Sequence, residues 1–168
     1  MFREHHAGVC AYAQRRAPAE LAQDAVAETF LVAWRRLDDV PADALPWLYG
    51  VARRALANQR RSAARGAALA ERIATATPAG GGGDPAEAIG EAEVVRIALG
   101  RLSDRDRETL MLVAWDGLSG PRAASAMGCT HTAFKVRLHR ARARLARELR
   151  ALDGRTAERP LADSIEVG

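Results

Sequence analysis

The sequence has few of the features that mark secreted, membrane-bound or disulfide-rich proteins. Only two cysteines occur in 168 residues, Cys10 and Cys129. They lie far apart and form no CxxC pair, so neither a disulfide framework nor a zinc site is indicated. No apolar run approaches the roughly 20 residues that a membrane-spanning helix needs, and no signal peptide is recognisable. We therefore expect a cytoplasmic protein without membrane insertion.

Motifs for catalysis and for cofactor binding are also missing. The four glycines at 80–83 are followed by no lysine and stand outside a strand–helix context, so they do not form a phosphate-binding loop. His5, His6 and Cys10 come nearest to a metal site, but their spacing is awkward and no fourth ligand is evident. The sequence thus favours a protein that is not an enzyme and needs no cofactor or metal.

Aromatic residues make up only 5% of the chain, whereas alanine is abundant, which favours closely packed helices. The glycine- and proline-rich segment at 74–88 cannot hold a helix and indicates a flexible linker. We expect an all-α fold of two small helical domains joined by a flexible Gly-rich linker, with a helix-turn-helix in the C-terminal one. The expected boundaries are 1–66 for the first domain, 67–90 for the linker, 91–152 for the second domain and 153–168 for a disordered tail.

Positive charge is present and unevenly distributed. The net charge is +4 and the pI about 9.8. One arginine-rich stretch, 47–65, contains no acid, and another, 129–150, contains Glu148 alone. The segment between them, 71–93, is acidic. Two basic blocks predict two positive surfaces and permit a nucleic-acid partner.

The periodicity of the first half predicts helices at 2–16, 19–37 and 47–64. The outer side of the second carries acidic residues followed by Trp34 and Arg35, which suits a protein partner, although an ordinary solvated acidic face is the alternative. The third combines Trp47 and Tyr49 with arginines and amides, a composition that suits unstacked bases and phosphates. The alternative is that both aromatics belong to the core, and we favour it for Tyr49.

The second half contains the signals of a helix-turn-helix. Ser103 followed by Asp106 resembles a capping box, and Ser119 with Pro121 marks the start of a short helix. Gly128 suits a left-handed C-cap, and Thr130 can cap a final helix that runs to about residue 152. A short helix, a turn with glycine and a longer basic helix are the parts of a helix-turn-helix.

The final helix has two different sides. An apolar stripe for packing recurs at helical spacing, formed by Phe134, Leu138, Ala141, Leu145, Leu149 and Leu152. The opposite side holds Thr132, Lys135, Val136, His139 and Arg140. An apolar side chain among basic ones can contact a thymine methyl while its neighbours reach bases or phosphates. A solvated basic face is the alternative.

Two segments resemble bacterial RNA polymerase sigma factors. DAVAETFLVAWRRL (24–37) followed by WLYGVARRALANQRR (47–61) resembles their second conserved region, and residues 98–145, which include LSDRDRETLMLVAWDGLS and RLHRARARL, resemble their fourth. With these two regions alone, the chain is similar to the extracytoplasmic-function (ECF) type. Thr132 and Val136 replace the glycine and serine usual in that family, and Gly120 replaces an aromatic residue.

The resemblance implies a chain that binds core RNA polymerase, directs it to specific promoters and assists promoter opening. Its acidic helix matches the segment that docks on the polymerase clamp helices, which implies contacts from Asp24, Glu28, Phe30, Trp34 and Arg35. The following helix matches the part that captures the melted minus-ten element, which implies contacts from Trp47, Arg53, Arg54, Asn58 and Arg61. The helix-turn-helix matches the reader of the duplex minus-35 element, which implies contacts from Thr130, His131, Thr132, Lys135, Val136, His139 and Arg140.

Many members of that family are held inactive by an anti-sigma factor, so such a partner is possible here too. The alternative function is a stand-alone helix-turn-helix transcription regulator that binds duplex DNA. A regulator of that kind would not need an exposed acidic and aromatic docking face on the second helix.

Overall fold

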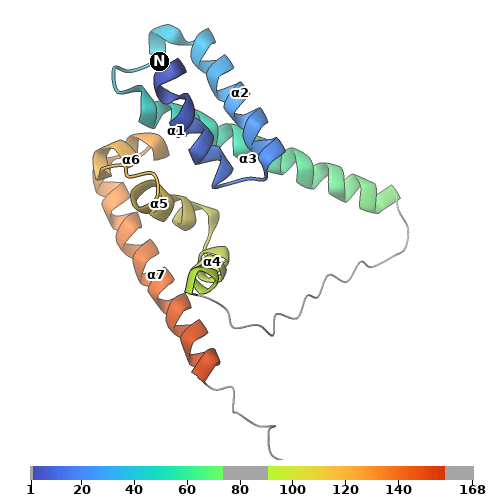
Figure 1. The fold of residues 1–168 in the computed structure, drawn as a ribbon, viewed down its shortest axis with the longest axis vertical. Helices are drawn as coiled ribbons and strands as arrows, with labels where there is room; N and C mark the ends of the chain where they lie inside the picture. The colour runs from blue at the N-terminus through green and yellow to red at the C-terminus, as the bar shows by residue number, and fades with distance from the viewer. Residues whose placement is uncertain (1, 74–90, 158–168) are drawn as a thin grey trace, which may run out of the picture.

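The computed structural model describes residues 2–73 and 91–157, and within these ranges the chain is helical and contains no strand. The elements are α1 (Phe2–Gln14), α2 (Ala19–Arg35), the 3-10 helix η1 (Leu37–Asp39), α3 (Ala44–Ile73), α4 (Glu91–Arg101), α5 (Asp104–Ala114), α6 (Gly120–Met127) and α7 (His131–Ala157). The all-α prediction is confirmed. Figure 1 shows α1–α3 grouped at one end and α4–α7 at the other, with the far ends of α3 and α7 projecting in different directions.

The N-terminal unit consists of α1, α2 and α3 packed on one another. Its core is built mainly from small and medium side chains, such as Ala22, Ala25 and Leu48, with the two tyrosines Tyr12 and Tyr49 as its large members. A buried hydroxyl completes the packing: the Oγ1 atom of Thr29 donates to the carbonyl of Ala25 one turn earlier, at 2.6 Å. Alanine-rich helices can approach closely, and this allows three helices of an aromatic-poor chain to bury a shared core.

Helix α3 is longer at both ends than the sequence predicted. It begins at Ala44 and includes Pro46 in its first turn, where the missing N–H of proline removes no intrahelical hydrogen bond. It ends at Ile73, so residues 67–73 are helical although they were assigned to the linker. The stretch AALAERI consists largely of strong helix formers, and no proline interrupts the chain before Pro78. The remaining linker and tail, 74–90 and 158–168, lie outside the described residues.

The C-terminal unit confirms the predicted caps. Ser103 is the N-cap of α5, and its hydroxyl accepts a hydrogen bond from the backbone N–H of Asp106 at 3.2 Å. Gly128 adopts the left-handed conformation (φ 63°, ψ 42°) after α6, and Thr130 accepts from the N–H of Ala133 at 3.2 Å at the start of α7. Ser119 is the N-cap of α6 but makes no side-chain capping bond. Helix, turn and helix form the predicted motif.

The apolar stripe of α7 anchors that helix to the unit. Phe134 and Ala141 are fully buried, and Leu138 and Leu145 are half-buried against neighbouring helices. The helix continues to Ala157, five residues beyond the boundary predicted at 152, because no proline stops it before Pro160 and extending an existing helix costs little. The anchor fixes which side of α7 faces outward.

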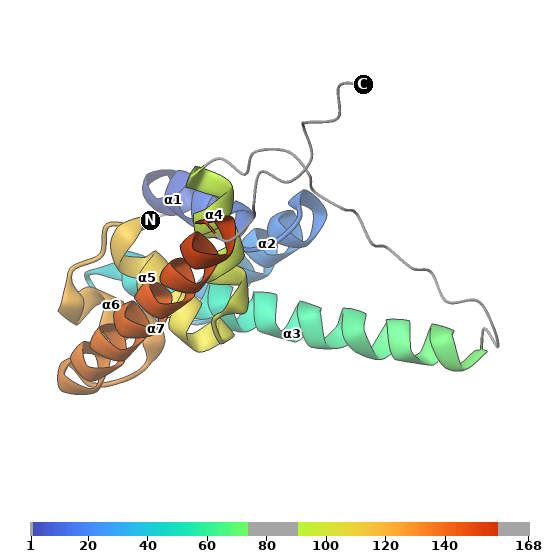
Figure 2. The same ribbon diagram turned by 90° about the horizontal axis from the view of Figure 1, so that it is seen from below.

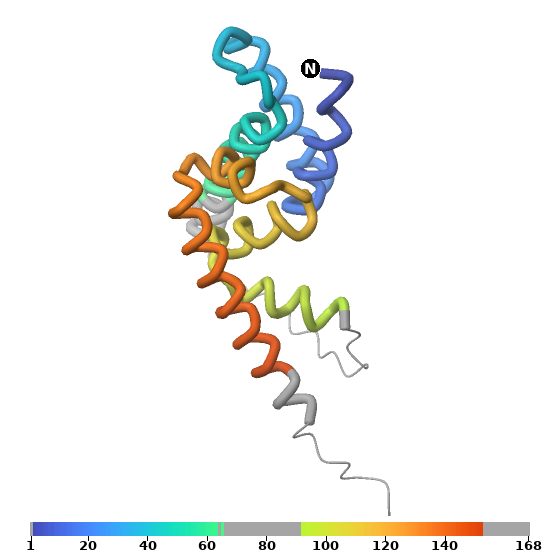
Figure 3. The backbone as a smooth tube through the Cα atoms, turned by 90° about the vertical axis from the view of Figure 1, so that its left-hand side faces the viewer, coloured from blue at the N-terminus to red at the C-terminus, as the bar shows by residue number. Residues whose placement is uncertain are grey.

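The two units also pack on each other, which the sequence did not indicate. Residues of α5, α6 and α7 share one apolar cluster with α1, α2 and α3. Helix α6 lies against α3, as Figures 2 and 3 show from two further directions. The backbones approach closely at Gly50, where a Cβ atom would lie only 3.2 Å from the carbonyl oxygen of Ala126. Glycine at position 50 therefore permits this contact.

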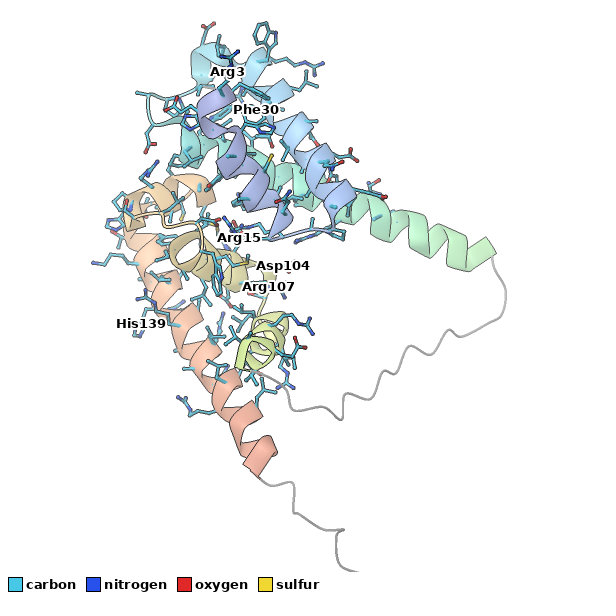
Figure 4. All side chains as sticks on the ribbon, in the orientation of Figure 1. Arg3, Arg15, Phe30, Asp104, Arg107 and His139 are labelled. Atoms are coloured by element: carbon cyan, nitrogen blue, oxygen red, sulfur yellow. The ribbon has the colours of Figure 1, made fainter. Side chains whose placement is uncertain are left out.

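A cluster of ion pairs joins α1 to the end of α5. The Nε atom of Arg16 donates to Glu108 at 2.7 Å, and its second nitrogen donates to Asp116 at 2.6 Å. The phenol of Tyr12 donates to the other oxygen of Glu108 at 2.6 Å, and Arg15 also donates to Asp116. The side chains of Arg16 and Asp116 are 4% and 0% exposed. Figure 4 shows Arg15 between the two units.

Truncation of the α7 anchor should destabilise the fold. Phe134→Ala removes a fully buried ring and leaves a cavity, so the free energy of unfolding should fall by about 3–5 kcal/mol. Urea denaturation followed by circular dichroism measures the change. Val136→Ala, on the exposed side of the same helix, should change it by no more than about 0.5 kcal/mol. Equal effects of the two substitutions would show that the two sides are wrongly assigned.

Both tyrosines of the chain should ionise at a higher pH than a free tyrosine. Burial, followed by the charge of Glu108, raises the pKa of Tyr12 well above its usual value, and burial, followed by Asp116, raises the pKa of Tyr49. Such groups contribute stability that is present below their unfolded pKa of about 10 and lost as the pH rises through the folded pKa. Absorbance titration of tyrosinate should therefore show ionisation above pH of about 10 in the native protein, accompanied by unfolding, and near 10 in urea. Titration at the same pH in both states would contradict the burial of these phenols.

Candidate functional site

The outer side of α7 is exposed at every position predicted for DNA readout. We call this set the α7 surface, and it consists of Thr130, His131, Thr132, Lys135, Val136, His139 and Arg140. Val136 is 46% exposed and has basic neighbours along the helix. In Figure 4, His139 points away from the body of the C-terminal unit. The structure thus brings all seven residues to one open edge of the helix-turn-helix.

A basic hollow of about 610 Å³ borders the α7 surface. Arg105 of α5, which the sequence analysis did not single out, and Arg144 of α7 help to line it. Arg144 is partly neutralised because it donates to the buried carboxylate of Asp106, which the hydroxyl of Ser103 also contacts at 2.9 Å. Arg105 is exposed. The hollow therefore extends positive charge from α7 onto the start of α5, where a phosphate backbone can be bound.

Gly120 also affects the α7 surface. A Cβ atom at this position would lie 2.8 Å from the Nε2 atom of His131, so the imidazole ring occupies the space above the glycine. Glycine at position 120 thus gives His131 a place against the start of α6.

The minus-ten candidates on α3 do not form one exposed set. Arg54, Asn58 and Arg61 are exposed, and Arg61 donates to the side-chain oxygen of Asn58. Trp47 is half-buried and packs against the core, so its side chain is only partly available. Arg53 is half-buried, and its buried Nε atom has no hydrogen-bond partner in the part of the chain that the structure describes.

Tyr49 belongs to the core, as favoured above. Its ring stacks on Tyr12 with the centroids 4.5 Å apart, and its hydroxyl donates to the carbonyl of Gly8 at 3.4 Å. The residue is 4% exposed, so its ring offers no stacking platform for a base.

Helix α2 presents one largely solvent-facing side, on which Glu28 is half-buried. At about 100° per residue, Asp24, Glu28, Leu31 and Arg35 lie along the same side, and Trp34 borders it. Trp34 is 77% exposed and Leu31 48%. Leu31 was missed by the sequence analysis, although its position one turn after Glu28 could have placed it there. Two exposed apolar side chains among charges are typical of a protein-binding surface.

Phe30 does not lie on this side of α2. Its ring contacts Phe2 edge-on at 4.7 Å and stacks with His6 at 5.8 Å between the centroids, so it faces α1. Together with Cys10 and residues of α2, these rings line an apolar groove of about 600 Å³. Phe30 thus supports the packing of α1 on α2 rather than the exposed set on α2.

No group of three or more His, Cys, Asp or Glu side chains that could hold a metal occurs within 2–73 and 91–157. Cys10 and Cys129 are both unpaired as disulfides and half-buried. Among the described helices, none is both long and apolar enough to cross a membrane.

Comparison with known families identifies both units. The family model for sigma-70 region 2 matches residues 1–66, and the family model for sigma-70 region 4 matches residues 93–145. The two matches correspond to α1–α3 and α4–α7. They define a two-region sigma factor and decide against the stand-alone regulator.

Relatives agree with this class. RNA polymerase sigma factor NccH of Alcaligenes xylosoxydans xylosoxydans is 32% identical over 140 residues, which cover 76% of this chain and 73% of the relative. ECF RNA polymerase sigma factor SigL of Mycobacterium tuberculosis is 30% identical over 143 residues, which cover 83% of this chain and 81% of the relative. The chain belongs to the sigma-70 family of RNA polymerase sigma factors, in its ECF group.

Solved structures show the same helical arrangement. CnrH in complex with the cytosolic domain of CnrY has a TM-score of 0.60 and 29% identity, covering 89% of this chain and 85% of that one. The sigma factor RpoE in complex with the anti-sigma factor NepR from Bartonella quintana has a TM-score of 0.64 and 24% identity, covering 89% of this chain and 94% of that one. The latter likeness concerns the fold alone.

Loss of a basic residue from the α7 surface should weaken duplex binding and its salt dependence. Each phosphate contact removed lowers the slope of log K against log salt by about one, so Lys135→Ala and Arg140→Ala should each show a shallower slope. Fluorescence anisotropy with duplex DNA at several salt concentrations measures it. Arg150→Ala, an exposed arginine near the other end of α7, serves as control. Slopes equal to that of the control would remove these residues from the interface.

Proposed function

We propose that this sigma factor docks on core RNA polymerase through the exposed side of α2 and reads promoter DNA through α3 and the α7 surface. The observation that carries the proposal is the exposure of all seven residues of the α7 surface, at the start and along the second helix of a helix-turn-helix. An anchored helix with an open basic side beside a basic hollow suits the major groove of duplex DNA.

The docking surface for polymerase comprises Asp24, Glu28, Leu31, Trp34 and Arg35. Trp and Arg are the side chains that most often carry the binding energy of protein interfaces, and the two acids give the surface a sign opposite to that of α7. DNA would be repelled from these carboxylates, whereas a basic protein surface would be attracted. Phe30 supports this side of α2 from behind by packing on α1.

On α3, we assign minus-ten contacts to Arg54, Asn58 and Arg61. Trp47 and Arg53 are half-buried, so they contribute only when their side chains become exposed. Guanidinium groups bind phosphates, and amide groups can hydrogen-bond unpaired base edges. The mixture suits a melted strand better than a duplex.

In this proposal the protein itself catalyses no reaction, because the polymerase synthesises the RNA. It acts in the cytoplasm, where polymerase and promoters are found. An anti-sigma factor is a further expected partner. The structure of CnrH with the cytosolic domain of CnrY supports this expectation, since CnrH shares 29% identity with the chain.

The test combines polymerase binding with transcription. The purified chain should co-elute with core RNA polymerase and support transcription from specific members of a promoter library. Trp34→Ala removes a highly exposed aromatic anchor, so affinity for core polymerase should fall about 30-fold, the range of an interface hot spot. Co-elution on gel filtration and titration of labelled protein measure the loss.

The control is Gln14→Ala, which removes an exposed side chain at the end of α1, outside the docking surface on α2. It should leave the affinity for polymerase unchanged. A folded chain that fails to co-elute with core polymerase would overturn the proposed function, and equal effects of the two substitutions would overturn the docking surface.

A further inference from the structure

The apolar groove between α1 and α2 takes no part in the proposed contacts with polymerase or DNA. One of its walls is a stripe of α1 whose members follow one another at intervals of four residues, namely Phe2, His6, Cys10 and Gln14. The facing wall belongs to α2 and includes Val26, Ala27 and Phe30. The volume between the walls is about 600 Å³. We call this site the α1–α2 groove.

The lining of the α1–α2 groove suits an uncharged ligand. Among the described residues that line it, none carries a carboxylate, an ammonium or a guanidinium group. Aromatic rings form part of the wall, since His6 lies 4.8 Å from Phe2 and 5.8 Å from Phe30 between ring centroids. Apolar sites of about this volume typically hold small organic molecules. The groove therefore fits a small molecule with an aromatic or aliphatic body.

A thiol and an imidazole meet inside this groove. Cys10 is half-buried and forms no disulfide. Its Sγ atom lies 3.6 Å from Nε2 and 3.7 Å from Nδ1 of His6, one helical turn earlier. A neutral imidazole accepts a hydrogen bond through one nitrogen, and because the sulfur reaches both, either tautomer offers the thiol an acceptor. The pair thus places a nucleophile beside a base, which is how cysteine is activated for attack.

The second cysteine has different surroundings. Cys129 lies in the turn between α6 and α7, where its sulfur accepts a hydrogen bond from Arg137 at 3.6 Å. It packs against the apolar cluster that both units share and does not line the α1–α2 groove. Cys129 therefore serves as an internal reference for the reactivity of Cys10.

We propose that Cys10 is a modification site for an α,β-unsaturated carbonyl compound with an uncharged aromatic or aliphatic body, which binds in the α1–α2 groove before it reacts. The sulfur forms a bond to the β carbon while the electrons of the C=C bond move toward the carbonyl and give an enolate. The thiol proton passes to His6 and ends on the α carbon. The product is a thioether, so the step needs no oxidant and releases no leaving group.

The first arm of the test compares the two cysteines of the full chain. N-phenylmaleimide carries the reactive group on an aromatic body, and N-(2-carboxyethyl)maleimide carries the same group on an anionic one. Mass spectrometry with peptide mapping follows each adduct over time. The aromatic probe should react at Cys10 about tenfold or more faster than at Cys129, with a rate that saturates because binding comes first. The anionic probe should show little preference, and in urea the two sulfurs should react equally.

The second arm separates binding from reaction. His6→Gln removes the base, so the maximal rate at Cys10 should fall about tenfold or more, while the probe concentration that gives half of that rate stays unchanged. The control is His5→Gln, which alters the neighbouring half-buried histidine of α1 outside the groove and should change neither value. Circular dichroism confirms that both variants are folded.

A third substitution narrows the groove itself. Ala27→Phe introduces a ring at an exposed position of the groove wall, where it can be accommodated without disturbing the core. It should raise the half-saturating concentration of N-phenylmaleimide several-fold. The rate with iodoacetamide, which is small and does not need the groove, should stay the same.

Each result counts for or against the site. Equal rates at the two cysteines of the folded chain, or the same preference with the aromatic and the anionic probe, would overturn the α1–α2 groove as a binding site. Equal maximal rates in the His6→Gln and His5→Gln variants would overturn the role of His6 as the base. These measurements involve neither DNA nor polymerase, so they succeed or fail independently of the proposed function.

Discussion

Arg16 determines how the two units of this sigma factor sit together. Its guanidinium spans Glu108 and Asp116, and the phenol of Tyr12 satisfies the remaining oxygen of Glu108. A buried charge is tolerated only when its hydrogen-bonding groups have partners. Here the donors of Arg16 and Tyr12 pair with the carboxylate oxygens of Glu108 and Asp116. The neighbouring apolar cluster, which spans both units, can then exclude water. The contacts of α6 with α3 follow from this arrangement.

The exposure of α7 has a separate origin within the C-terminal unit. Phe134 and Ala141 fix the rotation of the helix, while the caps at Gly128 and Thr130 fix where it begins. Rotation and start together decide which side chains can enter a groove. Arg105 and Arg144 add charge beside that edge, although Asp106 moderates one of them.

Features that depend on near neighbours were predictable from the sequence. The cap at Ser103, the left-handed Gly128, the apolar stripe of α7 and its exposed side all follow from spacing and residue type. Helix ends were less predictable, because α3 and α7 simply continue through residues that favour helix. Phe30 was assigned to docking, although its ring packs against Phe2 and His6 of α1. The ion-pair cluster could not be predicted from the sequence, because no neighbouring residue indicates that Tyr12 and Glu108 are partners across such a sequence separation.

The close approach at Gly50 has a consequence for how this protein could change over time. The contact between α3 and α6 is tight at this position, because a methyl group would lie 3.2 Å from the carbonyl oxygen of Ala126 and would require the backbones to shift slightly apart. Any larger residue at that position would act as a wedge between the units. A single codon therefore sets how closely the two units of this sigma factor pack, without a change of charge or of any residue assigned to DNA.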